Sequence, residues 1–354
     1  MSKIKLGDVT KIRTGKLDAN ASSENGKYPF FTCSKEPLRI DSYSYDCECV
    51  LVAGNGDLNV KYYKGKFDAY QRTYIIEDNS NGRLLIPYLY YFLELYVEEL
   101  RKQSIGGVIK YIKLGNLTDA IIELPSIEKQ KEVVNILNKS RKIVESKNVL
   151  LQSYDQLIKS RFVEMFGDRF TNDMGWDTKK LGEIVSFHNG KAHEQVVDVN
   201  GKYILVTSRA IASDFTDFRR TNEMLYPLHR NDIVMVMSDV PNGLALAKCQ
   251  LIEEDNKYTL NQRICSFDNY SFNAIFLLNL LNRHQHFLSF NNQNSQTNLR
   301  KNDILDCKLI VPPAELQNQF SDFVEQIDKL KFEVQKSLDE SKKLFDSLMQ
   351  EYFG

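Results

Sequence analysis

The sequence of 354 residues lacks the features that mark several common protein classes. Its charges almost cancel, since 46 Lys and Arg oppose 47 Asp and Glu, so the net charge of -1 gives no general attraction for nucleic acid or a membrane surface. Only 8 Pro and 17 Gly are present, which excludes a collagen-like or low-complexity chain. No apolar run approaches the roughly 20 residues that cross a bilayer, so neither a membrane span nor a signal peptide is expected.

The cysteines do not form a recognisable framework. Six cysteines in a chain of this length, with no Cys-x-x-Cys pair, predict reduced thiols and a cytoplasmic protein. Cys47 and Cys49 would share one face of a strand and could bind a metal together, but packing of small apolar thiols is the commoner role. No metal site is therefore predicted.

Catalytic signatures are missing as well. The turn from Gly54 to Gly56 does not continue into a dinucleotide-binding fingerprint, and Gly106-Gly107 is not followed by the Lys-Ser or Lys-Thr of a phosphate-binding loop. The Asn/Asp-Pro-Pro-aromatic motif of amino methyltransferases does not occur. His284 and His286 are expected in a helix, where residues i and i+2 point apart, so they make a poor metal pair. We predict no active site and no cofactor bound by this chain.

An internal repeat is the main feature that is present. Residues 125–167 and 312–354 align without a gap at an offset of 187 and share ten identities in 43 positions, where about three are expected. Further matches pair Lys5-Leu6-Gly7-Asp8 with Lys180-Leu181-Gly182-Glu183, Gly15-Lys16 with Gly190-Lys191, and Gln71-Arg72 with Gln262-Arg263. Because the chain is also too long for one ordinary domain, we predict the order globular, helix, globular, helix.

Each repeated segment predicts a helix of roughly 40 residues, about 60 Å long. The apolar residues recur at a seven-residue period, which favours a helical partner. Residues 125–167 carry a net charge of +3 and residues 312–354 a net charge of -4, so the two helices are expected to pair with each other; packing of each on its own globular half is the alternative. The predicted pairing residues are Ile136, Ile143, Leu150, Leu157, Phe323, Ile327, Leu330, Val334, Leu338, Phe345 and Leu348, with Leu137, Val144, Leu151 and Ile158 beside the first stripe.

The globular halves mix strand-like and helical segments. Strands are predicted at residues 47–53, 73–76, 203–207 and 232–237. Helices are predicted at residues 87–100 and 273–290. Each half is therefore assigned to the α+β class.

Polar residues suited to recognition gather near loop tips. Residues 101–113 hold four basic residues and no acid, and their repeat mate, residues 291–300, is almost wholly amide, hydroxyl and Arg. Amides and Arg read base edges, whereas a hydrolytic or metal site would need carboxylates or His. Any one of these residues could equally be an ordinary solvated side chain. The candidate DNA-binding residues are Lys16, Lys61, Lys64, Arg72, Lys110, Lys113, Lys191, Arg209, Arg219, Arg220, Asn242, Arg263, Gln296, Asn298, Arg300 and Lys301.

Taken together, these motifs resemble the specificity subunit of type I restriction-modification systems. The resemblance is carried by the two Lys-Leu-Gly openings, by the runs 231–234, 238–243 and 259–265, and by the closings at 124–130 and 311–317 that lead into the long helices. It implies two target recognition domains, each reading half of a bipartite DNA target, separated by two long antiparallel helices that form a coiled coil with pseudo-twofold repeat. The corresponding segments are 1–123, 124–167, 168–311 and 312–354.

The resemblance also implies the partners. These are double-stranded DNA, two modification (methyltransferase) subunits that bring S-adenosylmethionine, and restriction subunits that bring ATP and magnesium. The first half reads Ala69-Tyr70-Gln71-Arg72 where the second has the more familiar Leu260-Asn261-Gln262-Arg263, so unrelated half-sites are expected. Two other classes remain: a protein-interaction scaffold, which would expose aromatic anchors, and a nuclease with scattered carboxylates, which would bring Asp and Glu together.

Overall fold

The protein divides into two compact units in the computed structural model, which describes residues 2–240, 243–291 and 295–354. Unit 1 comprises Met1–Leu150 with Val334–Gly354, and unit 2 comprises Leu151–Glu333. Both long helices, α4 (Ile127–Phe166) and α9 (Ala314–Phe353), contribute to both units. The division into four segments made from the sequence therefore stays a prediction.

Unit 1 is built on a six-stranded sheet in the order β2-β7-β5-β6-β3-β4. β5 is its buried centre, because the run from Cys49 to Ala53 is apolar on both faces of the strand. α2 packs on this sheet, together with Val133 and Leu137 of α4 and Met349 of α9. The elements are β1 (Ser2–Lys5), α1 (Leu6–Val9), β2 (Thr10–Thr14), η1 (Ala19–Ala21), β3 (Tyr28–Phe31), β4 (Leu38–Ile40), β5 (Tyr45–Ala53), β6 (Val60–Ala69), β7 (Thr73–Asp78), α2 (Ile86–Gln103), α3 (Leu114–Thr118) and β8 (Ile121–Leu124).

Unit 2 repeats this plan with shorter strands. Its four-stranded sheet has the order β10-β17-β13-β15, and β12-β11-β16 form a second sheet. Phe162 of α4 and Phe320 of α9 close its core. The elements are β9 (Thr178–Lys180), η2 (Leu181–Glu183), β10 (Ser186–Asn189), β11 (Tyr203–Val206), α5 (Ser208–Ala212), β12 (Arg219–Thr221), β13 (Ile233–Val236), β14 (Ser238–Asp239), β15 (Cys249–Leu251), β16 (Tyr258–Leu260), β17 (Ile264–Asp268), α6 (Ala274–Leu281), α7 (Gln285–Leu288), β18 (Thr297–Asn298), α8 (Lys301–Leu305) and β19 (Lys308–Ile310).

The internal repeat has the same structural role in both units. Lys5 forms an ion pair with Asp119 at 2.8 Å, and its repeat mate Lys180 forms one with Asp306 at 2.7 Å. The Gln130 side chain accepts from the backbone N–H of Leu85 just ahead of α2, and Gln317 accepts from Asn273 just ahead of α6. These equivalent contacts confirm two homologous α+β domains.

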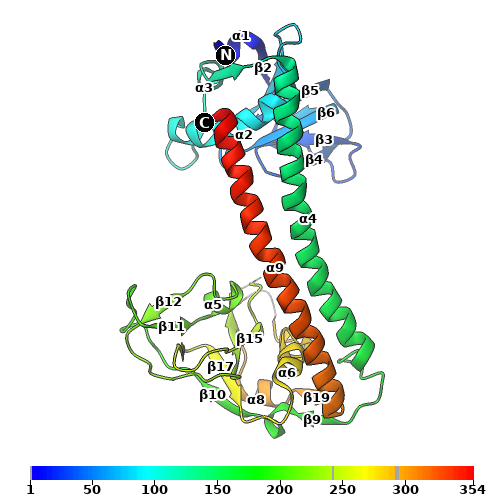
Figure 1. The fold of residues 1–354 in the computed structure, drawn as a ribbon, viewed down its shortest axis with the longest axis vertical. Coiled ribbons are helices and arrows are strands. Elements are labelled where there is room, and N and C mark those ends of the chain that lie inside the picture. The colour runs from blue at the N-terminus through cyan, green and yellow to red at the C-terminus, as the bar shows by residue number, and fades with distance from the viewer. Residues whose placement is uncertain (1, 241–242, 292–294) are drawn as a thin grey trace. The chain divides into compact units, whose positions relative to one another are not determined.

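The two long helices pack antiparallel within each unit, as expected for a coiled coil (Figure 1). In unit 1 the Lys147 ammonium donates to the Ser337 carbonyl at 2.9 Å and to the Ser341 hydroxyl at 2.7 Å. In unit 2 Lys331 forms an ion pair with Asp155 at 2.8 Å. In this pair the cation belongs to α9, the helix with a net negative charge, and the anion belongs to α4, the helix with a net positive charge. The pair therefore does not follow from the opposite net charges of the two helices. Each helix also packs on the cores of both units. Pairing of the helices and packing on the globular halves, the two alternatives left open by the sequence, therefore occur together.

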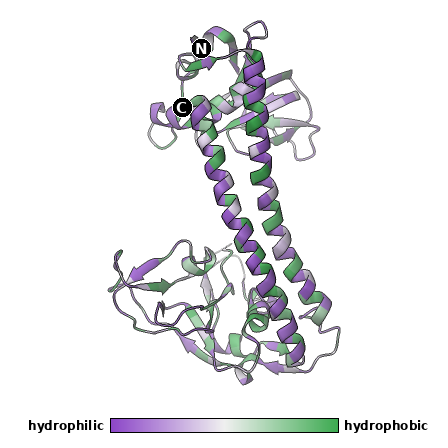
Figure 2. Ribbon diagram, in the orientation of Figure 1, coloured by the Kyte–Doolittle hydropathy of each residue, from purple (hydrophilic) through white to green (hydrophobic). Residues whose placement is uncertain are grey.

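The packed stripe on α4 differs from the one predicted. Ile143, Leu150 and Leu157 are 50%, 40% and 44% exposed, whereas their neighbours Leu137, Val144, Leu151 and Ile158 are buried or half-buried. On α9, Leu330 is also exposed, while the other predicted residues, Phe323, Ile327, Val334, Leu338, Phe345 and Leu348, are buried or half-buried, as is Ile136 on α4. The sequence showed two adjacent apolar stripes on α4, and only the packed structure selects between them, leaving the other exposed. Figure 2 shows hydrophobic positions distributed along α4.

The helix predicted at residues 273–290 is broken in two. α6 ends at Leu281, and α7 begins at Gln285. Arg283 has a φ of +51°, and the His284 side chain caps α7, so the backbone cannot continue as one helix. The expectation that His284 and His286 lie in one helix was therefore wrong. Burial lowers the pKa of His284 to about 4.

Two further properties of the described residues bear on other protein classes. None of the helices in residues 2–240, 243–291 and 295–354 is long and apolar enough to cross a membrane. Within the same ranges, no three His, Cys, Asp or Glu side chains are grouped so that they could hold a metal ion.

Candidate nucleic-acid interface

In unit 1 the basic loop after α2 is held against the loop that follows the central strand β5. Asn55 and Ile105 each form a β-bridge with Tyr111. The backbone N–H of Gly56 also donates to the Lys110 carbonyl at 2.9 Å. These bonds fix the base of the loop and leave its tip in solvent, where Val108 is fully exposed and Ile109 is 62% exposed.

Unit 2 places an amide cluster at the equivalent position. β14, which follows the central strand β13, pairs with β18 through Ser238 and Asn298. The Ser238 hydroxyl also accepts from the Gln296 side chain at 2.9 Å and donates to the Asn298 side-chain oxygen. Among the described residues these contacts use only one polar atom of each amide, so the Gln296 oxygen and the Asn298 nitrogen can bind other partners.

The same short helix follows both loops. Lys113 precedes α3 and its backbone N–H donates to the Asn116 side chain at 2.7 Å. Arg300 precedes α8 and its backbone N–H donates to the Asp303 carboxylate at 2.8 Å. Both cationic side chains are exposed at these helix starts, so the two units present the same loop frame with different side chains.

In unit 2 the Asp239 side chain binds backbone groups that follow β14. Its carboxylate accepts from the backbone N–H groups of Val240, Ala245 and Leu246 at 2.7 to 3.0 Å. Val240 and Leu244 stay 62% and 80% exposed beside this turn. Asn242, predicted to contact DNA, lies outside the described residues.

Four predicted basic residues contact their own unit. Lys64 forms an ion pair with Glu48 at 3.1 Å, and Arg209 forms one with Asp217 at 2.6 Å. Lys61 donates to the Asn59 side chain, and burial lowers its pKa. Arg220 lies 5.1 Å over the Phe218 ring and donates to the Gly201 carbonyl at 3.4 Å. Each would have to exchange an existing partner in order to bind a phosphate.

The other cations are more available. Lys16, Arg72, Lys110, Lys191, Arg219 and Arg263 are exposed, and none of them makes a side-chain hydrogen bond or ion pair with the described part of the chain. Lys301 is exposed and stacks 5.4 Å over the Phe187 ring. These residues lie in loops or at element ends, where a nucleic acid could reach them.

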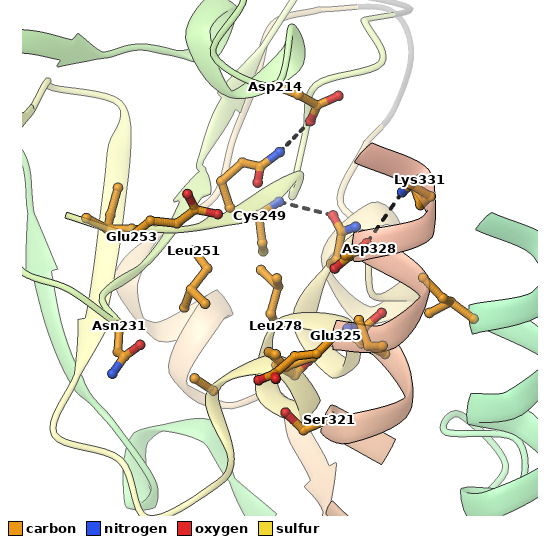
Figure 3. Close-up of a pocket in the computed structure, with 18 of the residues that line it drawn as sticks. Asp214, Asn231, Cys249, Leu251, Glu253, Leu278, Ser321, Glu325, Asp328 and Lys331 are labelled. Atoms are coloured by element: carbon orange, nitrogen blue, oxygen red, sulfur yellow. Dashed lines mark hydrogen bonds and ion pairs between the residues drawn. The ribbon is translucent and has the colours of Figure 1, made fainter. Parts of the chain in front are cut away.

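A wide hollow lies within unit 2. An open space of about 1670 Å³ is bounded by β15, α6 and α9 (Figure 3). Two of the lysines that line it are paired, since Lys331 contacts Asp155 and Lys248 contacts Asp214, both at 2.8 Å. Burial raises the pKa of Asp328 and also that of the Cys249 thiol, so this thiol is not activated as a nucleophile.

Sequence reasoning overlooked the exposed aliphatic residues at the loop tips. Val108, Ile109, Val240 and Leu244 stand beside the polar residues described above. The signal was visible in Gly106-Gly107-Val108-Ile109, because an apolar pair after two glycines has no helix or strand face to join. Aliphatic side chains at such places can contact thymine methyl groups or wedge between base steps.

Comparison with known proteins gives consistent matches. The family described as type I restriction modification DNA specificity domain matches residues 1–153 and 174–341. The type I restriction enzyme EcoDI specificity subunit of Escherichia coli is 40% identical over 158 residues, which are 44% of this chain and 34% of that protein. The MjaVIII specificity subunit of Methanocaldococcus jannaschii is 23% identical over 214 residues, 56% of this chain and 50% of that protein. The match spans about a third to a half of these relatives' length.

Solved structures share the fold. The type I restriction-modification S subunit from M. genitalium superimposes with a TM-score of 0.63 at 17% identity, covering 100% of this chain and 96% of that one. A second match is a chain from a structure that describes complex assembly and conformational transition of the type I restriction-modification system. It gives a TM-score of 0.59 at 14% identity and covers 99% of this chain and 97% of that one.

Proposed function

Because the chain belongs to the type I restriction-modification DNA specificity family, we propose that it is a sequence-specific DNA-binding subunit whose two units each read one half of a bipartite target. The observation that carries the proposal is the pair of equivalent loop frames. Lys113 and Arg300 precede α3 and α8 in the same way, while the loops before them differ in chemistry. The same frame with different side chains is what reading two unrelated half-sites would require.

The long helices are proposed to dock two modification subunits. Leu157, Ser160 and Glu164 on α4 have identical repeat mates on α9 in Leu344, Ser347 and Glu351, and all six are exposed. Their spacing of three and four residues places each trio on one helix face. An exposed apolar residue repeated with its polar neighbours fits the same partner bound once per repeat.

The chain itself supplies recognition and no chemistry. S-adenosylmethionine would be bound by the modification subunits, and ATP with magnesium by the restriction subunits. The unit 2 hollow gives no reason to assign chemistry to this chain, because its Cys249 thiol is buried and two of its lysines are held in ion pairs. The protein-interaction scaffold remains the second candidate, since the aromatic side chains of Phe332 and Phe170 are 69% and 49% exposed.

The proposed function is tested by comparing DNA binding with and without modification subunits. We expect weak, salt-sensitive binding by the isolated chain, because its net charge of -1 gives little attraction to phosphates. Adding modification subunits should produce tight binding to one target and not to shuffled DNA. Fluorescence anisotropy at two salt concentrations measures both states. A scaffold would bind its protein partner and leave DNA binding unchanged and non-specific.

Loop substitutions should separate the half-sites. Replacing Arg300 and Lys301 with Ala should weaken binding of the assembled complex to its cognate target by about tenfold or more, because a lost base contact costs about 1 to 3 kcal/mol. Replacing Lys110 and Lys113 should do the same through the other half-site. Sequencing of methylated sites should show that each variant accepts other bases in one half-site only. Unchanged affinity and methylation in both variants would move the recognition surface away from these loops.

A further inference from the structure

A short turn carrying Gln-Arg occurs at the same place in both units. In unit 1 the backbone N–H of Thr73 donates to the Tyr70 carbonyl at 2.8 Å, closing a turn with Gln71-Arg72 at its centre. In unit 2 Ile264 donates to Asn261 at 3.3 Å around Gln262-Arg263. Each turn leads directly into a sheet strand, β7 or β17.

The same glycine holds each turn in place. The backbone N–H of Gly15 donates to the Thr73 carbonyl at 3.0 Å, and that of Gly190 donates to the Ile264 carbonyl at 3.1 Å. A Cβ on Gly15 would lie 2.1 Å from the Ala69 carbonyl oxygen, and one on Gly190 would lie 2.0 Å from the Asn261 oxygen. Only glycine allows this close approach, so the turns have one fixed position in each unit.

The frames differ by one residue after the glycine. Leu17 bridges to Tyr70 in unit 1, whereas Lys191 bridges to Asn261 in unit 2. Lys16 is therefore an extra residue and is not the structural mate of Lys191, although the two align in the sequence. The Gln-Arg pair is shared by both frames, and its arginine is the cation that they have in common.

Arg263 occupies a backbone conformation that favours glycine. Its φ is +71°, at the third position of the turn, where glycine is the usual residue when φ is positive. The surrounding hydrogen bonds hold the arginine at this positive φ, which is a strained conformation for a residue with a Cβ. A glycine would relieve that strain. The side chain is thus present despite an unfavourable backbone position.

Neither arginine side chain has a structural role of its own. Repeat mates such as Lys5 and Lys180 form equivalent ion pairs inside their units. In contrast, the guanidinium groups of Arg72 and Arg263 are exposed and contact no hydrogen-bonding or ion-pair partner in residues 2–240, 243–291 and 295–354. An exposed cation, repeated in a fixed frame and unused by the fold, points to an external anion.

We propose that the Gln-Arg turns are phosphate contacts, in which Arg72 and Arg263 each bind the DNA backbone while the loops at 104–113 and 291–300 read bases. This inference rests on the proposed DNA-binding function. Two half-sites of different sequence share their backbone chemistry, so the feature common to both units should bind what is common to both half-sites. The planar guanidinium matches phosphate oxygens in a bidentate arrangement.

The Arg263→Gly variant provides the decisive experiment. In the complex with modification subunits, we expect binding to cognate and shuffled DNA to weaken by the same factor, about tenfold, and the slope of log K against log salt to become shallower by about one. The thermal midpoint of the isolated chain should stay the same or rise, because the strained φ is relieved. A structural role for Arg263 would lower it.

Two further variants make the result specific. Arg230→Ala removes an exposed arginine of the same unit that was not predicted to bind DNA, and should leave affinity and salt slope unchanged. Arg72→Ala should repeat the effect of Arg263→Gly through the other half-site. Loss on cognate DNA alone would mean base reading and would overturn the proposal. Loss of modification-subunit binding, or no loss of DNA binding, would also overturn it. If the unsubstituted complex fails to bind DNA specifically, the proposed function itself fails.

Discussion

Four residues inserted into both long helices should lengthen the unspecified gap between the two half-sites without changing the half-sites themselves. α4 and α9 each run for 40 residues without interruption, so an insertion is carried along the whole following segment. Four residues add about 6 Å, which corresponds to about two base pairs at 3.4 Å each. The recognition loops lie outside the insertions and should read the same bases as before.

The insertions have to be matched because the helices are antiparallel. Lys147 contacts Ser337 and Ser341, so the paired sites are after Lys147 in α4 and after Ser337 in α9. A four-residue insertion rotates the following stripe by about 40°, whereas seven residues rotate it by only about 20° and add about 10 Å. The seven-residue pair is therefore the better-packed control and should widen the gap by about three base pairs.

Sequencing of methylated sites in cells that carry the modification subunits measures the gap directly. An insertion in α4 alone should instead reduce assembly, because the seam beyond Lys147 loses its partner residues. Full methylation at an unaltered gap in both matched variants would end the idea that these helices set the spacing.

Charging the repeated apolar position should remove modification subunits one at a time. Leu157 and Leu344 are 44% and 58% exposed, so Glu can replace either without disturbing a core. At a closed interface each new carboxylate would be buried without a partner, which weakens binding at that position by about 100-fold. The single variants should each retain one modification subunit, and the double variant should retain none.

Native mass spectrometry of the purified complex reads this stoichiometry, and methylation assays show whether a single subunit still acts on its half-site. Leu150→Glu is the matched control, because Leu150 is 40% exposed on the same helix but its repeat mate is Ser337. It should keep both subunits. Two subunits on the double variant would place the docking surface elsewhere, whereas loss of both in a single variant would mean that the two sites are coupled.

Much of the architecture was readable from residue patterns. The gapless repeat and the seven-residue period located both helices to within three residues of α4 and α9. The β-rich runs at 47–53 and 203–207 became β5 and β11, because local apolar runs between turn residues leave few other options. The resemblance to a known family then supplied the expected function.

Other features depended on packing between distant segments. The choice between the Ile143 stripe and the Val144 stripe on α4 was made by tertiary packing, because both stripes have the same period and similar hydropathy. Leu137 and Ile158 of the second stripe join the cores of the two units. The break at Arg283 arises where its backbone N–H donates to the Ala247 carbonyl and the neighbouring Asn282 side chain accepts from Cys249, contacts that no local pattern reveals.

The sequence by itself determined the repeat, its two long helices and the chemical character of its loops, because these depend on the order and period of residues along one chain. The tertiary structure decided which cations are available. Lys64 and Arg209 look like Arg72 and Arg263 in the sequence, but the first two face carboxylates brought close by the fold. The strained φ of Arg263 was likewise invisible, since backbone conformation at a turn is set by the strands that close it.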